Sequence, residues 1–260
     1  MSGLSATCAL FHREMLRHAR QPSRIIASLG TAVLFWLVIG SGFADSFRMP
    51  GTDLAEGVSY SAYLLPGMVG LIVLMGTVFA SISLIQDREE GFLQSVIVSP
   101  APMWSVVLAK VGAGALVATL EALLLLAAGY LAGLRPGVLG LALAALAAGL
   151  MAAGIIALGL ILAWRVGSVA GFHGMMNLVL MPMWLLSGAL FPPEGAAPWL
   201  GWVMRLNPLH WTTRTMRTSL DVAPMEPREA AIFWGASILF TIAVIAVACV
   251  TIRRKARRGQ

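Results

Sequence analysis

Residues 64–85 read LLPGMVGLIVLMGTVFASISLI, a run without a single ionisable side chain. An α-helix needs about 20 mostly apolar residues to cross the hydrocarbon layer of a membrane, which is about 30 Å thick. The charged run QDREE follows directly at residues 86–90, as expected where a helix leaves the lipid. This stretch therefore predicts a membrane-spanning helix.

Five further stretches have the same character, so six spans are expected in all. Of the 260 residues, 58% are hydrophobic and 12% are charged, about half the usual charged share of roughly 25%. A soluble sphere of this size could not hide so much apolar surface from water. The composition excludes an intrinsically disordered chain, a nucleic-acid-binding domain and a disulfide-stapled secreted domain. We predict a single all-α polytopic membrane domain, residues 1–260, with spans at 25–43, 64–85, 105–134, 138–164, 169–191 and 230–252.

The basic residues predict how the chain is oriented. Most of the 18 Lys and Arg residues fall in the N-terminal segment, in the loops after spans two and four, and in the C-terminal tail. The six on the other side are Arg48, Arg135, Arg205, Arg214, Arg217 and Arg228. Because cytoplasmic loops carry the excess of Lys and Arg, both termini are predicted to be cytoplasmic. Topology thus accounts for the net charge of +6, and no nucleic-acid partner and no disulfide are expected.

Residues 1–22 do not have the pattern of a cleavable signal. Apolar residues recur at helical spacing, namely Leu4, Cys8, Phe11, Met15 and Ala19. Polar and basic residues occupy the other faces, namely Ser5, His12, Arg13, Arg17 and Arg20. This pattern predicts an amphipathic helix lying in the cytoplasmic interface, with its arginines near anionic lipid headgroups. An ordinary solvated helix is the alternative.

The loop after span two predicts a short helix within residues 87–99. A charged cluster and Gly91 precede an apolar stripe, and Pro100 and Pro102 end it; the stripe is Phe92, Leu93, Val96 and Ile97. Such a helix, held at the membrane surface by two long spans, is suited to docking into a groove of a cytoplasmic partner. A connector that packs on its own bundle explains the pattern equally well.

Residues 192–228 are too long for a simple turn and too polar to span. Asn207 is a favourable N-cap, with Pro208 at the first helical position. Trp199, Trp202 and Trp211 suit headgroup depth. We predict two short external re-entrant helices.

Few polar residues lie within the spans. Lys110 can extend to the cytoplasmic interface, but Glu121 lies too deep, where an acidic residue costs about 2.5–3.5 kcal/mol. Small residues at helical spacing from Glu121 mark a close helix contact; they are Gly114, Ala118, Ala128 and Ala132. Glu121 is therefore either a structural hydrogen-bond partner of a neighbouring span or part of a substrate path.

Span five carries the other candidate path residues. His173 and Asn177 lie one helical turn apart and could face an inward cavity, although interhelical hydrogen bonding explains them as well. Met181 and its neighbouring methionines suit an apolar or amphipathic substrate. No second ligand stands at metal-site spacing, so no metal is expected. Pro182 predicts a kink that lets the outer half lean toward the external helices.

Two stretches resemble the membrane subunit of type-2 ABC exporters, the ABC-2 permease family. Arg88-Glu89-Glu90-Gly91-Phe92-Leu93, continuing to Ser99-Pro100, is similar to the family's Arg-Glu-x-Gly-Thr-Leu…Pro segment, with Phe92 in place of the commoner Thr. Ser187-Gly188-Ala189-Leu190-Phe191-Pro192, followed by Pro198-Trp199-Leu200 and Asn207-Pro208-Leu209, resembles the Ser-Gly-x-x-Phe-Pro…Pro…Asn-Pro-Leu motif. The resemblance covers nearly the whole chain and is closest to bacterial drug, lipid and nodulation-factor exporters.

The resemblance implies an exporter in the bacterial plasma membrane that moves an amphipathic or lipid-like substrate. A separate cytoplasmic ABC ATPase would bind ATP and Mg²⁺ and would dock on the coupling residues Arg88, Glu89, Glu90, Gly91, Phe92, Leu93 and Val96. The chain itself has no phosphate-binding loop, so it is expected to bind no cofactor. The path would run between this chain and a second copy or a paralogue. Its candidate residues are Glu121, His173, Asn177 and Met181, and those of the external gate are Phe191, Pro192, Trp199, Asn207 and Pro208.

Three other classes of protein fit the sequence less well. A rhomboid-like protease also has six spans but requires Gly-x-Ser-Gly, and here Leu185-Leu186 precede Ser187-Gly188. An ion-coupled carrier or channel would be expected to carry several buried charges and broken helices. A membrane assembly factor without transport activity is the third alternative.

Overall fold

The protein is described by a computed structural model that covers residues 3–43, 58–99 and 101–258. The side chains of Ile97, Val98, Ala132 and residues 254–258 lie outside this description, as do Arg48 and Pro100. All the regular secondary structure of the described residues is helical. Six helical runs are long and apolar enough to cross a membrane, so this is a multi-pass membrane protein.

The six runs follow the predicted order. They are α2 (Pro22–Gly42), α3 (Tyr60–Glu89), α5 (Trp104–Ala128) with the 3₁₀ turn η1 (Gly129–Ala132), α6 (Val138–Val166), the segment from α7 to η3 (Val169–Ala189), and α11 (Pro227–Arg258). The short helices are α1 (Gly3–Ala19), α4 (Phe92–Val98), η4 (Pro193–Gly195), α9 (Pro198–Leu206) and α10 (Pro208–Ser219).

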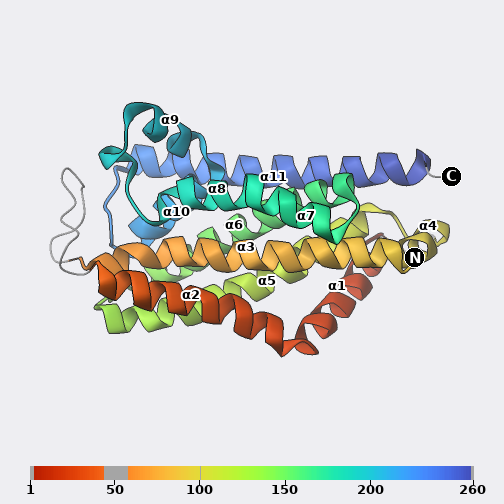
Figure 1. Ribbon diagram of the computed structural model, residues 1–260, viewed down its shortest axis with the longest axis horizontal. Helices are drawn as coiled ribbons and strands as arrows, with labels where there is room; N and C mark the ends of the chain where they lie inside the picture. Colours follow the sequence, from red (N-terminus) through yellow and green to blue (C-terminus); the bar gives the residue numbers. More distant parts are fainter. Residues whose placement is uncertain (1–2, 44–57, 100, 259–260) are drawn as a thin grey trace.

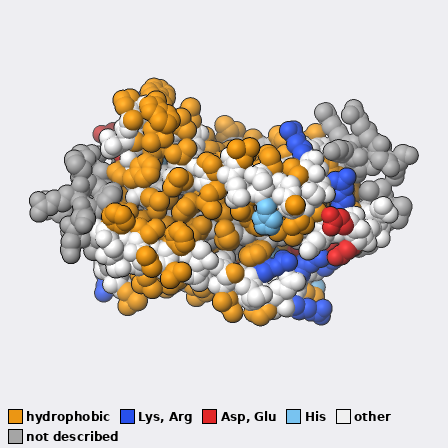
Figure 2. Space-filling view, viewed as in Figure 1, with side chains coloured by type: hydrophobic (Ala, Val, Ile, Leu, Met, Phe, Trp, Pro, Cys, Tyr) orange, Lys and Arg blue, Asp and Glu red, His pale blue; other side chains and the backbone are white. Residues whose placement is uncertain are grey.

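Figure 1 shows an elongated bundle with the short helices at its two ends. α1, α4 and the C-terminus lie at one end, called here the α4 end, and α9 and α10 lie at the other, the α9 end. Charged side chains gather mostly at the α4 end, whereas the middle of the visible face is mainly hydrophobic (Figure 2). This distribution matches a bundle whose middle lies in lipid.

α3 is the central helix, and most of its residues are buried. It packs against α2, α5 and α6. The close approaches depend on small residues, because a side chain added at Gly67 would come within 2.7 Å of the backbone of Ala189, and one at Gly114 of α5 within 2.8 Å of Ile156 in α6. The small-residue face predicted for α5 is thus a helix contact at Gly114.

Several boundaries differ from the sequence expectations. α3 runs from residue 60 to 89 rather than from 64 to 85. Tyr60, Tyr63 and Asp87 in the added turns are buried against other helices, while Arg88 and Glu89 at its last turn are exposed. The predicted helical region 87–99 is divided by Gly91, whose φ of +76° ends α3 and lets α4 start at Phe92. The span predicted to end at 134 leaves α-helical geometry at Ala128.

The fifth span is irregular, as Pro182 predicted. It consists of α7 (Val169–Met175), the π-helix η2 (Met176–Leu180), α8 (Met181–Trp184) and the π-helix η3 (Leu185–Ala189). Pro182 lies in the first turn of α8 and has no N–H to continue regular α-helical bonding from the preceding turn. π-helical segments are often found at functional sites.

Candidate functional site

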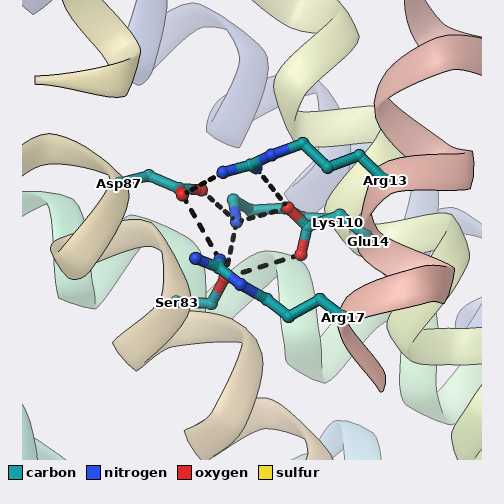
Figure 3. A network of polar contacts seen from close by, with 6 residues as sticks. All are labelled: Arg13, Glu14, Arg17, Ser83, Asp87 and Lys110. Carbon is teal, nitrogen blue, oxygen red and sulfur yellow. Dashed lines mark hydrogen bonds and ion pairs between the residues drawn. The ribbon is translucent and has the colours of Figure 1, made fainter. Parts of the chain in front are cut away.

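Asp87, at the α4 end of α3, is the centre of a polar network in which helices α1, α3 and α5 meet (Figure 3). Its side chain is 0% exposed. Oδ1 lies 2.9 Å from Nη2 of Arg13 and 3.3 Å from Nη1 of Arg17, both on α1. Oδ2 lies 2.6 Å from Nζ of Lys110 on α5. One carboxylate therefore joins three helices.

Glu14 and Ser83 complete the network. Glu14 Oε1 lies 3.0 Å from Lys110 Nζ and 3.0 Å from Arg13 Nη1. Lys110 also donates to the Ser83 hydroxyl at 2.8 Å. Burial lowers the pKa of the Arg13 guanidinium, but its hydrogen bond to Asp87 and the nearby carboxylates more than offset this, so that pKa is raised.

Two expectations are corrected here. Lys110 does not extend to the interface but is buried and bound to Glu14 and Asp87. Arg13 and Arg17 turn toward α3 rather than only toward headgroups, because a carboxylate shielded from water attracts them more strongly than a screened surface charge.

Arg13 also connects the network to α4. Its guanidinium lies 3.8 Å from the ring centroid of Phe92, the first residue of α4. The Arg88 guanidinium lies 5.4 Å from the ring of Trp164 on α6. Phe92 and Arg88, on either side of the Gly91 break, thus hold α4 to two parts of the bundle.

The apolar face of α4 packs on the chain's own bundle. Leu93 and Val96 are buried and Phe92 is half-buried. The exposed residues here are Arg88, Glu89 and Glu90 together with Gln94 and Ser95. Among the described side chains of this segment, those that are fully exposed to another molecule are therefore polar or charged.

The candidate path residues occupy two different environments. Glu121 is 6% exposed and its carboxylate accepts a hydrogen bond of 2.7 Å from Ser28 of α2. His173 and Asn177 are exposed on the surface of the fifth span, and Met181 is half-buried. The structure therefore places Glu121 between α2 and α5, apart from the other three.

A second polar cluster lies at the α9 end, around Gly188. This glycine has a φ of +82°, a conformation that favours glycine. Its carbonyl accepts bonds from the Tyr63 hydroxyl (3.0 Å) and from Nη2 of Arg217 (2.6 Å). The Arg217 guanidinium also lies 3.7 Å from the ring centroid of Tyr63. These contacts hold the end of η3 between α3 and α10.

α10 is positioned by its first turn, and the predicted cap at Asn207 is confirmed. Asn207 accepts a bond from the Leu209 N–H and donates to the Met183 carbonyl, with Pro208 at the first helical position. His210 Nδ1 lies 3.1 Å from the Ser187 carbonyl oxygen. Burial lowers the pKa of His210 to about 4, and nearby arginines lower it while the Ser187 bond raises it.

The other candidate gate residues lie around this cluster. Trp199 is 69% exposed on α9, while Phe191 and Pro192 are half-buried just after η3. The Tyr60 hydroxyl donates to the Leu190 carbonyl at 2.9 Å. The residues of the Ser-Gly-x-x-Phe-Pro…Asn-Pro-Leu motif thus lie close together at the α9 end.

The sequence reading missed Glu14, Ser83 and Tyr63 as site residues, and treated Asp87 and Lys110 separately. The available signals were weak: Glu14 is the single acid within a basic helix, and Asp87 directly follows an apolar run. Arg217 and His210, seven residues apart, share a face of α10.

In the part of the chain that the structure describes, no cluster of His, Cys, Asp and Glu could hold a metal ion.

Six apolar helices with polar networks at both ends define the class as a multi-pass membrane protein. Residues 5–220 match the family described as ABC-2 type transporter. The chain belongs to this family of transporter permeases.

Two relatives agree with this assignment. "Probable multidrug ABC transporter permease YbhR" of Escherichia coli K12 is 27% identical over 171 residues, which is 65% of this chain and 46% of YbhR. The match thus spans about half the length of YbhR. "Nodulation protein J" of Neorhizobium galegae is 24% identical over 270 residues, covering 98% of this chain and 95% of that protein.

Proposed function

We propose that this chain is the membrane-spanning permease subunit of an ATP-driven exporter, with ATP hydrolysed by a separate ATPase subunit. The substrate would be amphipathic or lipid-like, as the resemblance to drug, lipid and nodulation-factor exporters implies; one relative is named as a probable multidrug permease. In this proposal the α4 end is cytoplasmic, the α9 end is external, and both termini are cytoplasmic in a bacterial plasma membrane.

The observation that carries the proposal is the network that joins α4 to three helices. The ATPase would contact the exposed residues Glu89 and Glu90 beside α4. Displacement of α4 acts on Arg13 through Phe92, and Arg13 shares the Asp87 carboxylate with Lys110 of α5. α1, α3 and α5 are therefore expected to move as one unit.

α3 would carry this movement to the external end. Asp87 and Tyr63 are 24 residues apart on one helix, or about 36 Å by helical rise. Tyr63 holds the Gly188 carbonyl of the Ser-Gly-x-x-Phe-Pro motif. A shift of α3 would therefore change the contacts of η3, α9 and α10, which we assign to the external gate.

The substrate path is proposed to run between this chain and a second copy or a paralogue. His173 and Asn177 are exposed on a membrane-spanning segment, where polar side chains facing lipid are costly. A partner permease or a wet path would remove that cost. We assign Glu121 instead to the α2–α5 contact because it is buried against Ser28.

The test is reconstitution in proteoliposomes with an ABC ATPase from the same genome that co-purifies with this chain. ATP hydrolysis that rises with an added amphiphile, together with export of that amphiphile, is the expected result. The double variant Glu89→Ala/Glu90→Ala should insert normally but lose most of the stimulation. The matched control is Glu226→Ala/Glu229→Ala, two exposed acids at the other end of the bundle, which should retain it. Export without any ATPase, or full stimulation of the Glu89→Ala/Glu90→Ala variant, would contradict the proposal.

A further inference from the structure

The polar network beside α4 carries an excess of positive charge. Three cations, Arg13, Arg17 and Lys110, share two carboxylates, those of Glu14 and Asp87. No other acidic side chain of the described residues forms an ion pair with them. Because charges sheltered from water are costly unless paired, a further anion at this site would stabilise it.

The two arginines keep surface available for that anion. The side chain of Arg13 is 34% exposed and that of Arg17 is 23% exposed, whereas the Asp87 side chain is 0% exposed. Among the described residues, Arg17 donates to Ser83 and Asp87 through Nη1 alone. A guanidinium has five N–H donors, so the outer edge of Arg17 can bind a second anion without releasing Asp87.

An open surface pocket of about 370 Å³, called here the cavity, lies along the C-terminal half of α1 and is lined by residues of α1 and by Gln21. Its polar lining consists of His12, Arg13, Arg17, Arg20 and Gln21. Arg20 is exposed and, within the described residues, forms no ion pair. Several fork-shaped donors around one cavity suit an oxyanion such as a phosphate group.

The surroundings of the cavity favour a phosphate carried by a lipid. Leu16, which is exposed, forms part of its wall. The cavity ends at Gln21, next to Pro22, where α1 gives way to the apolar helix α2. Ile26, on the first turns of α2, is also exposed. A phosphate bound here would have apolar side chains beside it for an acyl chain.

We propose that this cavity binds the phosphate headgroup of one anionic phospholipid, which completes the charge balance of the network. This is a defined site on one side of α1, distinct from a general attraction of arginines to a membrane surface. It does not depend on the proposed ATPase partner, because binding involves this chain and the lipid alone. The bound lipid would fix Arg13 and Arg17, and with them the position of α1 against α3.

The test is native mass spectrometry of the full chain purified in detergent and titrated with phosphatidylglycerol or phosphatidylcholine. We expect one phosphatidylglycerol to bind about tenfold more tightly than phosphatidylcholine, which carries no net charge. Arg20→Gln should weaken phosphatidylglycerol binding about fivefold, the effect of one basic residue near a membrane surface. The matched control is Arg165→Gln, an exposed arginine at the end of α6 outside the cavity, which should bind as the unmodified chain does.

Each contrary result has a distinct meaning. Equal binding of the two lipids, or equal loss in the Arg20→Gln and Arg165→Gln variants, would overturn a specific site. Displacement of the lipid by excess inorganic phosphate would identify soluble phosphate as the ligand and overturn the lipid assignment. Unchanged lipid binding of Arg20→Gln combined with a weakened complex with the ATPase would make this face a protein contact. Unaltered melting temperatures of both variants establish that the differences reflect binding.

Discussion

Replacing Asp87 by Asn tests whether the network at the α4 end holds the helices together. The substitution keeps the size of the side chain and removes the charge that faces three cations at 2.6–3.3 Å. Only Glu14 would then remain to balance Arg13, Arg17 and Lys110. Breaking a buried ion pair by removing one partner costs about 3–5 kcal/mol. We expect Asp87→Asn to lower the free energy of unfolding by that amount.

A double-mutant cycle separates the ion pair from general damage. Lys110→Met alone should also destabilise, because it leaves both carboxylates with fewer cations. The double variant Asp87→Asn/Lys110→Met should be more stable than the sum of the single effects predicts, by about 1 kcal/mol or more. The control is Glu89→Gln, an exposed carboxylate two residues away, which should change the stability by less than about 0.5 kcal/mol.

The measurement is reversible unfolding of the purified chain in mixed micelles, followed by tryptophan fluorescence. If Asp87→Asn stays within about 1 kcal/mol of the unmodified chain, or if the cycle shows no coupling between Asp87 and Lys110, the network does not hold α3 to α5. The mechanism proposed for transmission from α4 would then lose its physical basis.

Three further outcomes are expected. Gly67→Ala should lower the free energy of unfolding by about 1–3 kcal/mol, since the new methyl would lie 2.7 Å from the backbone of Ala189. Gly42→Ala is the control, because a methyl there meets no atom within 4 Å. Unfolding curves of the two variants measure the difference. Glu121→Gln should preserve transport and substrate range, and altered export would show that its charge is needed. Acidification from pH 6.5 toward 4 should destabilise the fold, because His210 binds a proton at a higher pH in the unfolded chain than in the folded chain. Over this range the melting temperature of the His210→Asn variant should fall less than that of the unmodified chain.

The sign of the pH effect follows from the direction of the pKa shift. In the fold, burial lowers the pKa of His210 from 6.5 to about 4. Between these values the unfolded chain binds a proton that the folded chain does not, so stability falls as the pH falls. The contribution of His210 is fully present above pH 6.5. A melting temperature that is independent of pH in this window would contradict this account of the cluster at the α9 end.

Much of the fold could be predicted from the sequence because lipid imposes simple demands on a chain. A spanning helix satisfies its own backbone hydrogen bonds and needs about 20 apolar residues, so runs such as residues 64–85 were recognisable without tertiary information. Local chemistry was also readable: the cap at Asn207 and the irregularity at Pro182 depend on residues next to one another in the chain.

What each polar residue contacts was decided by tertiary structure alone. Arg217 meets the Tyr63 carbonyl across 154 positions of sequence, and Lys110 meets Glu14 across 96; no local pattern encodes either pairing. Amphipathicity predicted an interfacial position for α1, but the apposition of α3 and α5 determined that Arg13 and Arg17 turn inward. The apolar content of the chain thus determined how often it crosses the membrane, because burial in lipid is additive along the sequence. The networks depend on which helices become neighbours, which only packing in three dimensions decides.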